Sequence, residues 1–214
     1  MRSSDKDLAA AMRGAAPARE LLAGIPIRES LRLDPVMRLT AKHMLASHAQ
    51  TAPVTVLSEA DATELVRLRG VFVASSEGAK VTYSHLLVKI VAAALAAHPR
   101  LNAALVDDTV KVYDEINVGM AMALPDGNLV VPVIRHADCL SVAEIAARAA
   151  ALQERGRGGK LTTADMQRGT FTLSNAGMVH SVRWTTPLLN PPQCAILATG
   201  AIAERAVVRD GAIC

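Results

Sequence analysis

The sequence predicts an α+β domain in which helices pack on a mixed sheet. First, helical and strand-like segments alternate irregularly, without the strict strand–helix order of a doubly wound fold. Second, pairs of short strands joined by turn residues stand among the helices. Third, 51% of the 214 residues are hydrophobic but only 2% are aromatic, a balance that favours alanine-rich helices packed closely on a sheet. A chain of this length forms one sizeable domain by default.

Residues 1–33 predict a short helical arm or linker ahead of a domain over residues 34–214. Acids, arginines and alanines alternate in this segment, and Pro17, Gly24 and Pro26 interrupt any long helix. The segment is either a solvated lead-in or a docking segment for a partner subunit. It contains no strand-rich module with a lysine at a hairpin tip, so no lipoyl domain is expected in it.

The pattern between residues 36 and 98 predicts three helices and one strand. The strand covers residues 54–57, and the helices cover residues 36–50, 61–69 and 82–98. Asp61 is expected to cap the second helix, because Glu64 follows it three residues later. The third helix is the longest and most apolar, and its expected buried stripe consists of Leu86, Leu87, Ile90, Val91 and Leu95.

Two hairpins and a capped helix are expected in the middle of the chain. The first hairpin pairs residues 101–106 with 109–113 around an Asp-Asp turn, and the second pairs residues 118–124 with 129–134 around Pro-Asp-Gly-Asn. Ser141, with Glu144 three residues later, forms a capping box and predicts a helix that continues through residue 153.

The stretch from residue 169 to residue 200 predicts two core strands around one exposed turn. A short strand over residues 170–173 is followed by Ser174 and Asn175, where a strand would normally turn. A second run, residues 194–198, is apolar on both faces and is expected to be buried. From the residues alone, Ser174 is either a hydroxyl that faces a site or a turn residue that bonds its own backbone.

Composition excludes several classes of function. The net charge of +3 is mild, the charges of both signs are interspersed, and aromatic residues for base stacking are scarce, so nucleic-acid binding has little support. No apolar run approaches the roughly 20 residues of a membrane span, and the start lacks a signal-peptide core, so a soluble cytoplasmic protein is expected. Cys139, Cys194 and Cys214 lack metal-ligand spacing, so no metal site is expected, and Cys194 is expected to be a buried thiol.

Two motifs carry a resemblance to a known family. Residues 172–177 read Thr-x-Ser-Asn-x-Gly and residues 190–197 read Asn-Pro-Pro-x-x-Ala-Ile-Leu. They resemble the catalytic domain of dihydrolipoyl acyltransferases, the core subunits of 2-oxoacid dehydrogenase complexes, which are related in fold to chloramphenicol acetyltransferase. The resemblance extends over about residues 34–213 and includes the segments 38–47, 53–69 and 117–138.

The resemblance implies a fold, a reaction and an assembly. The fold is the CoA-dependent acyltransferase fold, a two-layer sandwich of helices on a mixed, largely antiparallel sheet. The reaction moves an acyl group between CoA and a dihydrolipoyl group, a substrate arm that is not attached to this chain. By resemblance, Ser174 would donate a hydrogen bond to the oxyanion, Asn175 would line the CoA channel, and Gly200 and Ile202 would approach CoA. Relatives are usually trimers with active sites between subunits, and the implied partners are other 2-oxoacid dehydrogenase subunits.

The general base implied by the resemblance is a histidine in a histidine-x-x-x-aspartate-glycine signature. Relatives carry it downstream of the Arg-Asp-Gly turn that residues 209–211 resemble, and the given sequence stops at Cys214. We therefore expect a C-terminally incomplete fold, a nearly inactive isolated chain, and poor cover over Ile196, Leu197 and Ile202.

Alternatives follow from the same observation about the base. One is a naturally truncated, non-catalytic member of the family that acts as a scaffold or CoA-binding subunit. Another is an acyltransferase that uses His180, in the loop after the serine turn, as its base. His98 with Asn102 superficially resembles a variant of the signature but is expected to be a structural corner.

Overall fold

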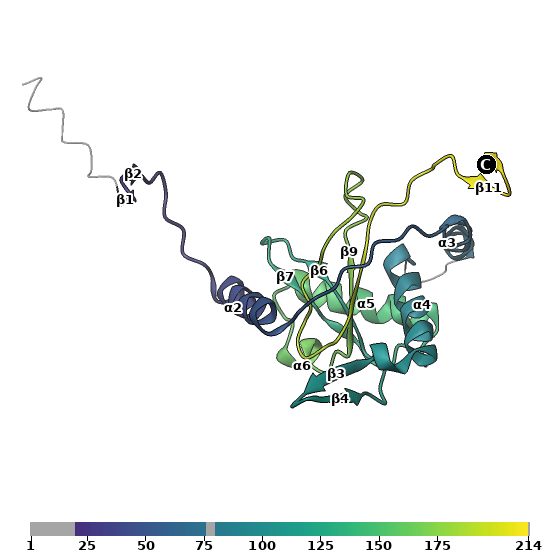
Figure 1. Cartoon of the computed structure of the whole chain (residues 1–214), viewed down its shortest axis with the longest axis horizontal. Coiled ribbons are helices and arrows are strands. Elements are labelled where there is room, and N and C mark those ends of the chain that lie inside the picture. The colour runs from purple at the N-terminus through teal and green to yellow at the C-terminus, as the bar shows by residue number, and fades with distance from the viewer. Residues whose placement is uncertain (1–19, 76–79, 214) are drawn as a thin grey trace, which may run out of the picture. The chain divides into compact units, whose positions relative to one another are not determined.

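A computed structural model describes residues 20–75 and 80–213 of the chain (Figure 1). The chain divides into two compact units, residues 1–38 and residues 39–214. The second unit contains all the residues of the expected site.

The described part of the first unit begins with a hairpin, not with a helical arm. Strands β1 (Leu21–Leu22) and β2 (Ile25–Pro26) pair antiparallel. Ala23 and Gly24 between them both have positive φ, 50° and 81°, which a continuing helix does not allow. Of the two alternatives, a helical arm is therefore wrong for residues 20–34 and a linker stays a prediction, while residues 1–19 lie outside the described residues. Helix α2 (Pro35–Gln50) begins where the first helix was expected.

The expected strand at residues 54–57 is not formed. Residues 51–62 adopt neither helix nor strand, and Val54 and Val56 are 89% and 84% exposed. A strand needs a neighbour to receive its hydrogen bonds, and none of the described strands pairs with this segment. Helix α3 (Thr63–Ser75) follows and runs beyond the expected end, with Asp61 Oδ1 accepting a 2.9 Å hydrogen bond from the Thr63 backbone N–H.

Helix α4 (Tyr83–Ala97) is the expected long apolar helix, but its buried face is rotated from the expected stripe. Ile90 is 52% exposed, whereas Val88 and Ala92 are fully buried. The buried residues are His85, Leu86, Val88, Val91, Ala92 and Leu95. The small Ala92 allows a close approach that a count of large apolar side chains overlooks.

The two expected hairpins are confirmed, and a 3-10 turn, η1 (Pro99–Leu101), precedes them. Strands β3 (Ala103–Val106) and β4 (Thr109–Val112) pair antiparallel around Asp107 and Asp108, whose φ values are positive, as a tight two-residue turn requires. The second hairpin is divided into four short strands, in which β6 pairs with β7 and β5 with β8. Their bounds are β5 (Val118–Met120), β6 (Met122–Ala123), β7 (Leu129–Val130) and β8 (Val133–Ile134).

Helix α5 (Val142–Arg157) confirms the expected capping box. The Ser141 backbone N–H donates to Glu144 Oε2 at 2.7 Å, and the Glu144 N–H donates to Ser141 Oγ at 3.2 Å. A short helix, α6 (Thr163–Met166), follows. None of the helices in the described part of the chain has the length and apolar character that crossing a membrane requires.

The central sheet has the order β10-β9-β5-β8 and is mixed, as expected, but two of its three strand pairs are parallel, so the expectation of a largely antiparallel sheet is wrong for it. Strand β9 (Phe171–Asn175) pairs parallel with both β5 and β10 (Ile196–Thr199), while β8 is antiparallel to β5. Helices α4 and α5 pack on each other and on this sheet (Figure 1), and together they enclose one core. The core residues include Val88, Val91 and Leu95 of α4, Val118 of β5, Ile145 and Ala149 of α5, and Leu173 of β9.

Strand β10 is an edge strand, so the expected burial of residues 194–198 is wrong. Leu197 is 38% exposed, and Cys194 is exposed, not a buried thiol. The poor cover expected over Leu197 and Ile202 is confirmed, since Ile202 is 44% exposed, whereas Ile196 is half-buried. Among the described strands, β10 pairs only with β9. Farther along the chain, the expected turn at residues 209–211 joins β11 (Val208–Arg209) to β12 (Ala212–Ile213).

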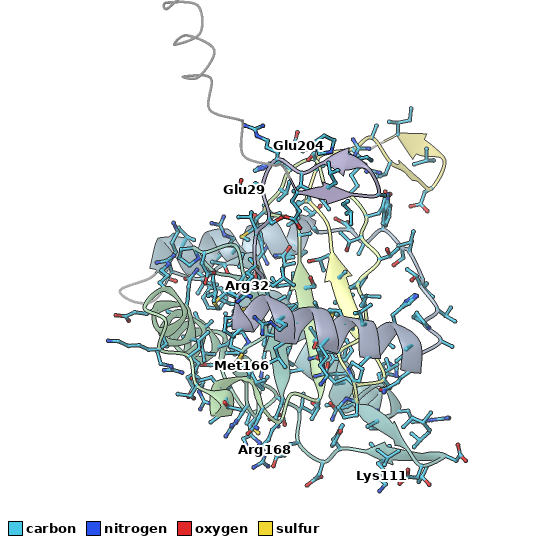
Figure 2. All side chains as sticks on the ribbon, turned by 90° about the vertical axis from the view of Figure 1, so that its left-hand side faces the viewer. Glu29, Arg32, Lys111, Met166, Arg168 and Glu204 are labelled. Carbon is cyan, nitrogen blue, oxygen red and sulfur yellow. The ribbon has the colours of Figure 1, made fainter. Side chains whose placement is uncertain are left out.

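A buried amide fixes the start of both central strands. Asn117, 1% exposed, donates from Nδ2 to Glu115 Oε2 at 2.8 Å and to the Arg168 carbonyl at 2.9 Å. Its backbone N–H donates to Thr170 Oγ1 at 3.0 Å, which joins the entry of β5 to the entry of β9. The Arg168 guanidinium (Figure 2) forms an ion pair with Glu115. The hydrogen bond from Asn117 and this ion pair hold the pKa of Glu115 below its ordinary value.

We predict that stability falls below about pH 6.5 because of His85. Its Nδ1 accepts a 3.2 Å hydrogen bond from the Thr82 backbone N–H at the start of α4, and burial lowers the pKa of His85 from its ordinary value of 6.5. Below pH 6.5 the unfolded chain therefore binds more protons than the folded chain, so the free energy of unfolding decreases as the pH is lowered. Urea unfolding between about pH 7.5 and about pH 5.5 measures the decrease.

The variant His85→Gln keeps an acceptor for the Thr82 N–H and removes the titrating ring, so its pH dependence should be shallower than that of the wild type. His48→Gln, at an exposed histidine of α2, is the matched control. Parallel pH profiles for the wild type and His85→Gln would contradict the assignment.

Candidate functional site

The candidate site lies where two parallel strands end side by side. Within β9, Phe171 to Leu173 are buried, and the exposure rises at Ser174 and Asn175. Because β10 runs parallel to β9, with Ala198 opposite Ser174 and Thr199 opposite Asn175, the two strands end at the same edge of the sheet. Ser174 and Asn175 are thus the last residues of a strand, not part of a separate turn. Gly200 follows directly on the neighbouring strand.

The Asn175 side chain joins three segments of the chain. Its Oδ1 accepts hydrogen bonds from the Gly177 backbone N–H at 2.8 Å and from Thr199 Oγ1 at 3.0 Å. Its Nδ2 donates to Ser84 Oγ at 3.0 Å, which connects the strand end to the first turn of α4. The amide therefore holds the turn after β9, the end of β10 and the start of α4 in one arrangement.

The Ser174 hydroxyl is half-buried and makes no hydrogen bond to any part of the chain that the structure describes. A bond from Ser174 to its own backbone, the structural alternative considered from the sequence, is therefore not present among the described residues. A hydroxyl on a fixed strand end with its proton uncommitted is available to donate to a bound group.

Two glycines allow the backbone of the site to pack without side chains. A Cβ on Gly177 would lie 2.5 Å from the Gly200 carbonyl oxygen, and a Cβ on Gly200 would overlap the Arg183 carbonyl. The Ala201 N–H donates to the Val182 carbonyl at 2.8 Å, and the Ala176 N–H donates to the Thr199 carbonyl at 3.0 Å. The loop of residues 176–183 is thus bound directly to the corner after β10.

Several apolar side chains on the segments next to this corner are exposed. Met178 and Val179 on the loop are 77% and 55% exposed, Trp184 after it is 47% exposed, and Ile202 lies beyond Gly200. Exposed apolar residues gathered around polar groups are typical of binding surfaces.

The two histidines considered as possible bases, His180 and His98, lie in different parts of the fold. His180 is exposed in the loop after Gly177. His98 ends α4, and Asn102 is 1% exposed, with its Nδ2 donating to the carbonyls of Tyr113 and Glu115. The structural interpretation of the His98–Asn102 corner fits these contacts. Within residues 20–75 and 80–213, no cluster of three or more histidine, cysteine, aspartate or glutamate side chains is arranged to hold a metal ion.

Three residues at the site were not identified from the sequence. Ser84 and Thr199 bind the Asn175 amide, and the Arg183 backbone closes over Gly200. Thr199 could have been suspected, since a hydroxyl that ends a strand beside a glycine is typical of a site edge. Ser84 is separated from Asn175 by 91 residues, and no local pattern indicates that contact.

Solved structures share this architecture. Dihydrolipoamide acetyltransferase from Azotobacter vinelandii matches with a TM-score of 0.83 and 32% identity, over 94% of this chain and 82% of that chain. In that protein, one serine, one histidine and one asparagine have been investigated for their role in the catalytic mechanism. The cubic core of the pyruvate dehydrogenase multienzyme complex matches with the same TM-score, identity and coverage.

Curated relatives agree with the solved structures. The acetyltransferase component of the pyruvate dehydrogenase complex from Bacillus subtilis is 38% identical over 186 residues, which cover 85% of this chain and 42% of that protein. The succinyltransferase component of the 2-oxoglutarate dehydrogenase complex from Haemophilus influenzae is 36% identical over 176 residues, or 81% of this chain and 42% of that protein. The chain thus spans less than half the length of either relative.

Helices packed on a mixed sheet, with a serine at the open end of a central strand, place the chain in the α+β class of acyltransferase catalytic cores. The family model for the 2-oxoacid dehydrogenases acyltransferase (catalytic domain) matches residues 26–214. The chain belongs to this family.

Replacing Gly200 by alanine should destabilise the fold by about 1–3 kcal/mol, because the added methyl group meets backbone atoms that cannot rotate away. Urea unfolding measures the change in the free energy of unfolding. Gly70→Ala is the matched control, since a Cβ at Gly70 in α3 meets nothing within 4 Å. That control should stabilise the protein by about 0.5–1 kcal/mol. Equal stability of Gly200→Ala and the wild type would contradict the close backbone contact.

Proposed function

We propose that this chain is the acyltransferase subunit of a 2-oxoacid dehydrogenase complex and moves an acyl group between a dihydrolipoyl group and CoA. The named activities of its relatives, an acetyltransferase and a succinyltransferase, support the reaction class and do not favour a non-catalytic scaffold. Both are components of such complexes.

The uncommitted hydroxyl of Ser174 is the observation that carries the proposal. When a thiolate attacks a thioester carbonyl, negative charge develops on the carbonyl oxygen, and a donor already in place stabilises that charge. Ser174 meets this requirement because β9 is bonded on both sides, by β5 and by β10, and its hydroxyl has no competing acceptor among the described residues. We assign it as the oxyanion donor.

Asn175, Gly200 and Ile202 would form the wall along which CoA lies. Three hydrogen bonds hold the Asn175 amide, which leaves one of its N–H groups for a ligand. Gly200 follows Thr199 at the end of β10, beside the strand end that carries Ser174, and the exposed side chain of Ile202 offers apolar contact. In this proposal Asn175 both contacts CoA and fixes the Ser174 backbone.

Removal of the thiol proton requires a base with a pKa near the working pH. His180 lies on the loop of residues 176–183 that follows β9, and it is exposed. We keep it as the candidate base within the described residues. If it has this role, His180→Ala should abolish turnover near neutral pH and have less effect at about pH 9, where more of the dithiol is already thiolate.

Ser174→Ala should lower kcat/KM for acyl transfer to dihydrolipoamide by about 10²-fold, because the oxyanion loses its donor. Acetyl-CoA and succinyl-CoA are compared as acyl donors, which also tests acyl specificity. The assay is run at about pH 9, so that the supply of thiolate depends little on a protein base. Ser181→Ala, at an exposed serine in the same loop, is the control and should leave the rate unchanged. Equal rates for Ser174→Ala and the wild type would contradict the assignment.

We also propose that the chain associates as a trimer with its sites between subunits, within a larger core. The open edge of β10 and the exposed Leu197 and Ile202 support association, as does the similarity to a cubic core.

We further propose a location in the cytoplasm. The free thiols of Cys139 and Cys194 agree with this location, because the cytoplasm is reducing.

If the chain forms trimers, light scattering should give three times the mass of the single chain, or a whole-number multiple of the trimer mass for a larger core. Leu197→Glu should shift the distribution towards single chains, because a charge on the exposed edge has to be desolvated on association. Leu105→Glu is the control, because Leu105 on β3 is more exposed than Leu197. Only single chains at every concentration would contradict the trimer.

A further inference from the structure

A pocket of 330 Å³ lies at the β8 side of the central sheet, away from the strands that end at Ser174. Its walls come from three places in the chain: β8 and the residue that follows it, helix α5, and helix α6. The lining residues are Val133, Arg135, Arg148, Ala151, Leu152, Arg155, Ala164 and Asp165. This volume falls within the range of small-molecule sites.

The spacing of the α5 residues explains the shape of the pocket. Arg148, Ala151, Leu152 and Arg155 stand at positions i, i+3, i+4 and i+7, so they share one face of the helix. Leu152 is 5% exposed and forms an apolar floor, while the short side chain of Ala151 leaves open space between the two arginines.

The lining is strongly basic, with three guanidinium groups against one carboxylate. The carboxylate, Asp165, is already occupied: it accepts hydrogen bonds from the Thr162 backbone N–H at 2.9 Å and from Thr162 Oγ1 at 3.0 Å. It also forms an ion pair with Arg155 at 2.8 Å. Asp165 therefore balances the charge of Arg155. The positive charges of Arg135 and Arg148 have no carboxylate in the lining to balance them.

Arg135 and Arg148 are held by backbone carbonyls instead of acids. Arg135 donates to the Ala164 carbonyl at 2.7 Å, and Arg148 donates to the Arg135 carbonyl at 3.2 Å. Neither forms an ion pair with a carboxylate of the described residues. Glu144, one turn before Arg148, interacts with it only at longer range, and its carboxylate is bound to Ser141.

The third arginine also has an unused donor. The Nε of Arg155 is buried and has no hydrogen-bond partner among the described residues. A buried donor without an acceptor is unfavourable, and a bound oxyanion that draws the side chain towards it would relieve that penalty. Three guanidinium groups held around an open pocket are the arrangement that proteins use for phosphate and carboxylate groups.

We propose that this pocket binds a small molecule carrying a multiply charged oxyanion, a phosphate or a dicarboxylate, at a site separate from the Ser174 site. Arg135 and Arg148 bind the anion, Val133 and Leu152 contact its apolar part, and Arg155 closes one side. Binding of the anion in this pocket is separate from acyl transfer and does not depend on the function proposed for Ser174.

Isothermal titration calorimetry of the full chain at low ionic strength tests the site, with pyrophosphate as the phosphate probe and succinate as the dicarboxylate probe. At least one of them should bind with a Kd below about 1 mM. The pair of substitutions Arg135→Gln and Arg148→Gln should weaken that binding by at least about tenfold, because two charge-assisted contacts are lost. Ala151→Leu should weaken it similarly by filling the pocket without changing any charge.

Arg157→Gln is the matched control, since Arg157 is exposed on the same helix, does not line the pocket, and carries the same charge. It should change the Kd by less than about twofold. Thermal unfolding of each variant without ligand establishes that it is folded, and the Ala151→Leu arm applies if the double variant is not. Binding of neither probe would overturn the proposal. So would equal weakening by Arg157→Gln, or binding of a hexaglutamate peptide but of neither small anion.

Discussion

The amide of Asn175 is the contact on which the geometry of the site depends. Its three hydrogen bonds, of 2.8 to 3.0 Å, join the turn after β9, the end of β10 and the first turn of α4. Each such bond contributes only about 1 kcal/mol net, but together they fix the backbone of the neighbouring Ser174. The serine hydroxyl can then remain unbonded because its position does not depend on a bond of its own.

The open edge of the sheet lies directly beside the strand end that carries Ser174. β10 pairs only with β9 among the described strands, and Leu197 and Ile202 on and after it are partly exposed. A strand edge and apolar side chains beside an available hydroxyl support our proposal that a second subunit completes the site. The glycine contacts keep this surface thin, since Gly177 and Gly200 let two backbone segments touch.

Local signals in the sequence predicted most of the helices and hairpins. The Ser141–Glu144 capping box was sufficient for α5, because both of its hydrogen bonds lie within four residues. The strand expected at residues 54–57 failed, because an extended segment becomes a strand only with a neighbour. The motif around Ser174 indicated the candidate site, but the bond between Asn175 and Ser84 depends on packing that brings together residues 91 positions apart. The arginine pocket, built from three elements, was missed for the same reason.

Amide hydrogen exchange of an Asn175→Ala variant tests the central claim most directly, because it needs neither substrate nor activity. The account predicts that the Gly177 N–H, which bonds to Asn175 Oδ1, and the Ala201 N–H, which bonds to the Val182 carbonyl, lose protection together. The Met120 N–H, bonded to the Pro132 carbonyl on the other side of the sheet, should stay protected. Unchanged protection at Gly177 and Ala201 would show that the site keeps its shape without the amide and would contradict the account.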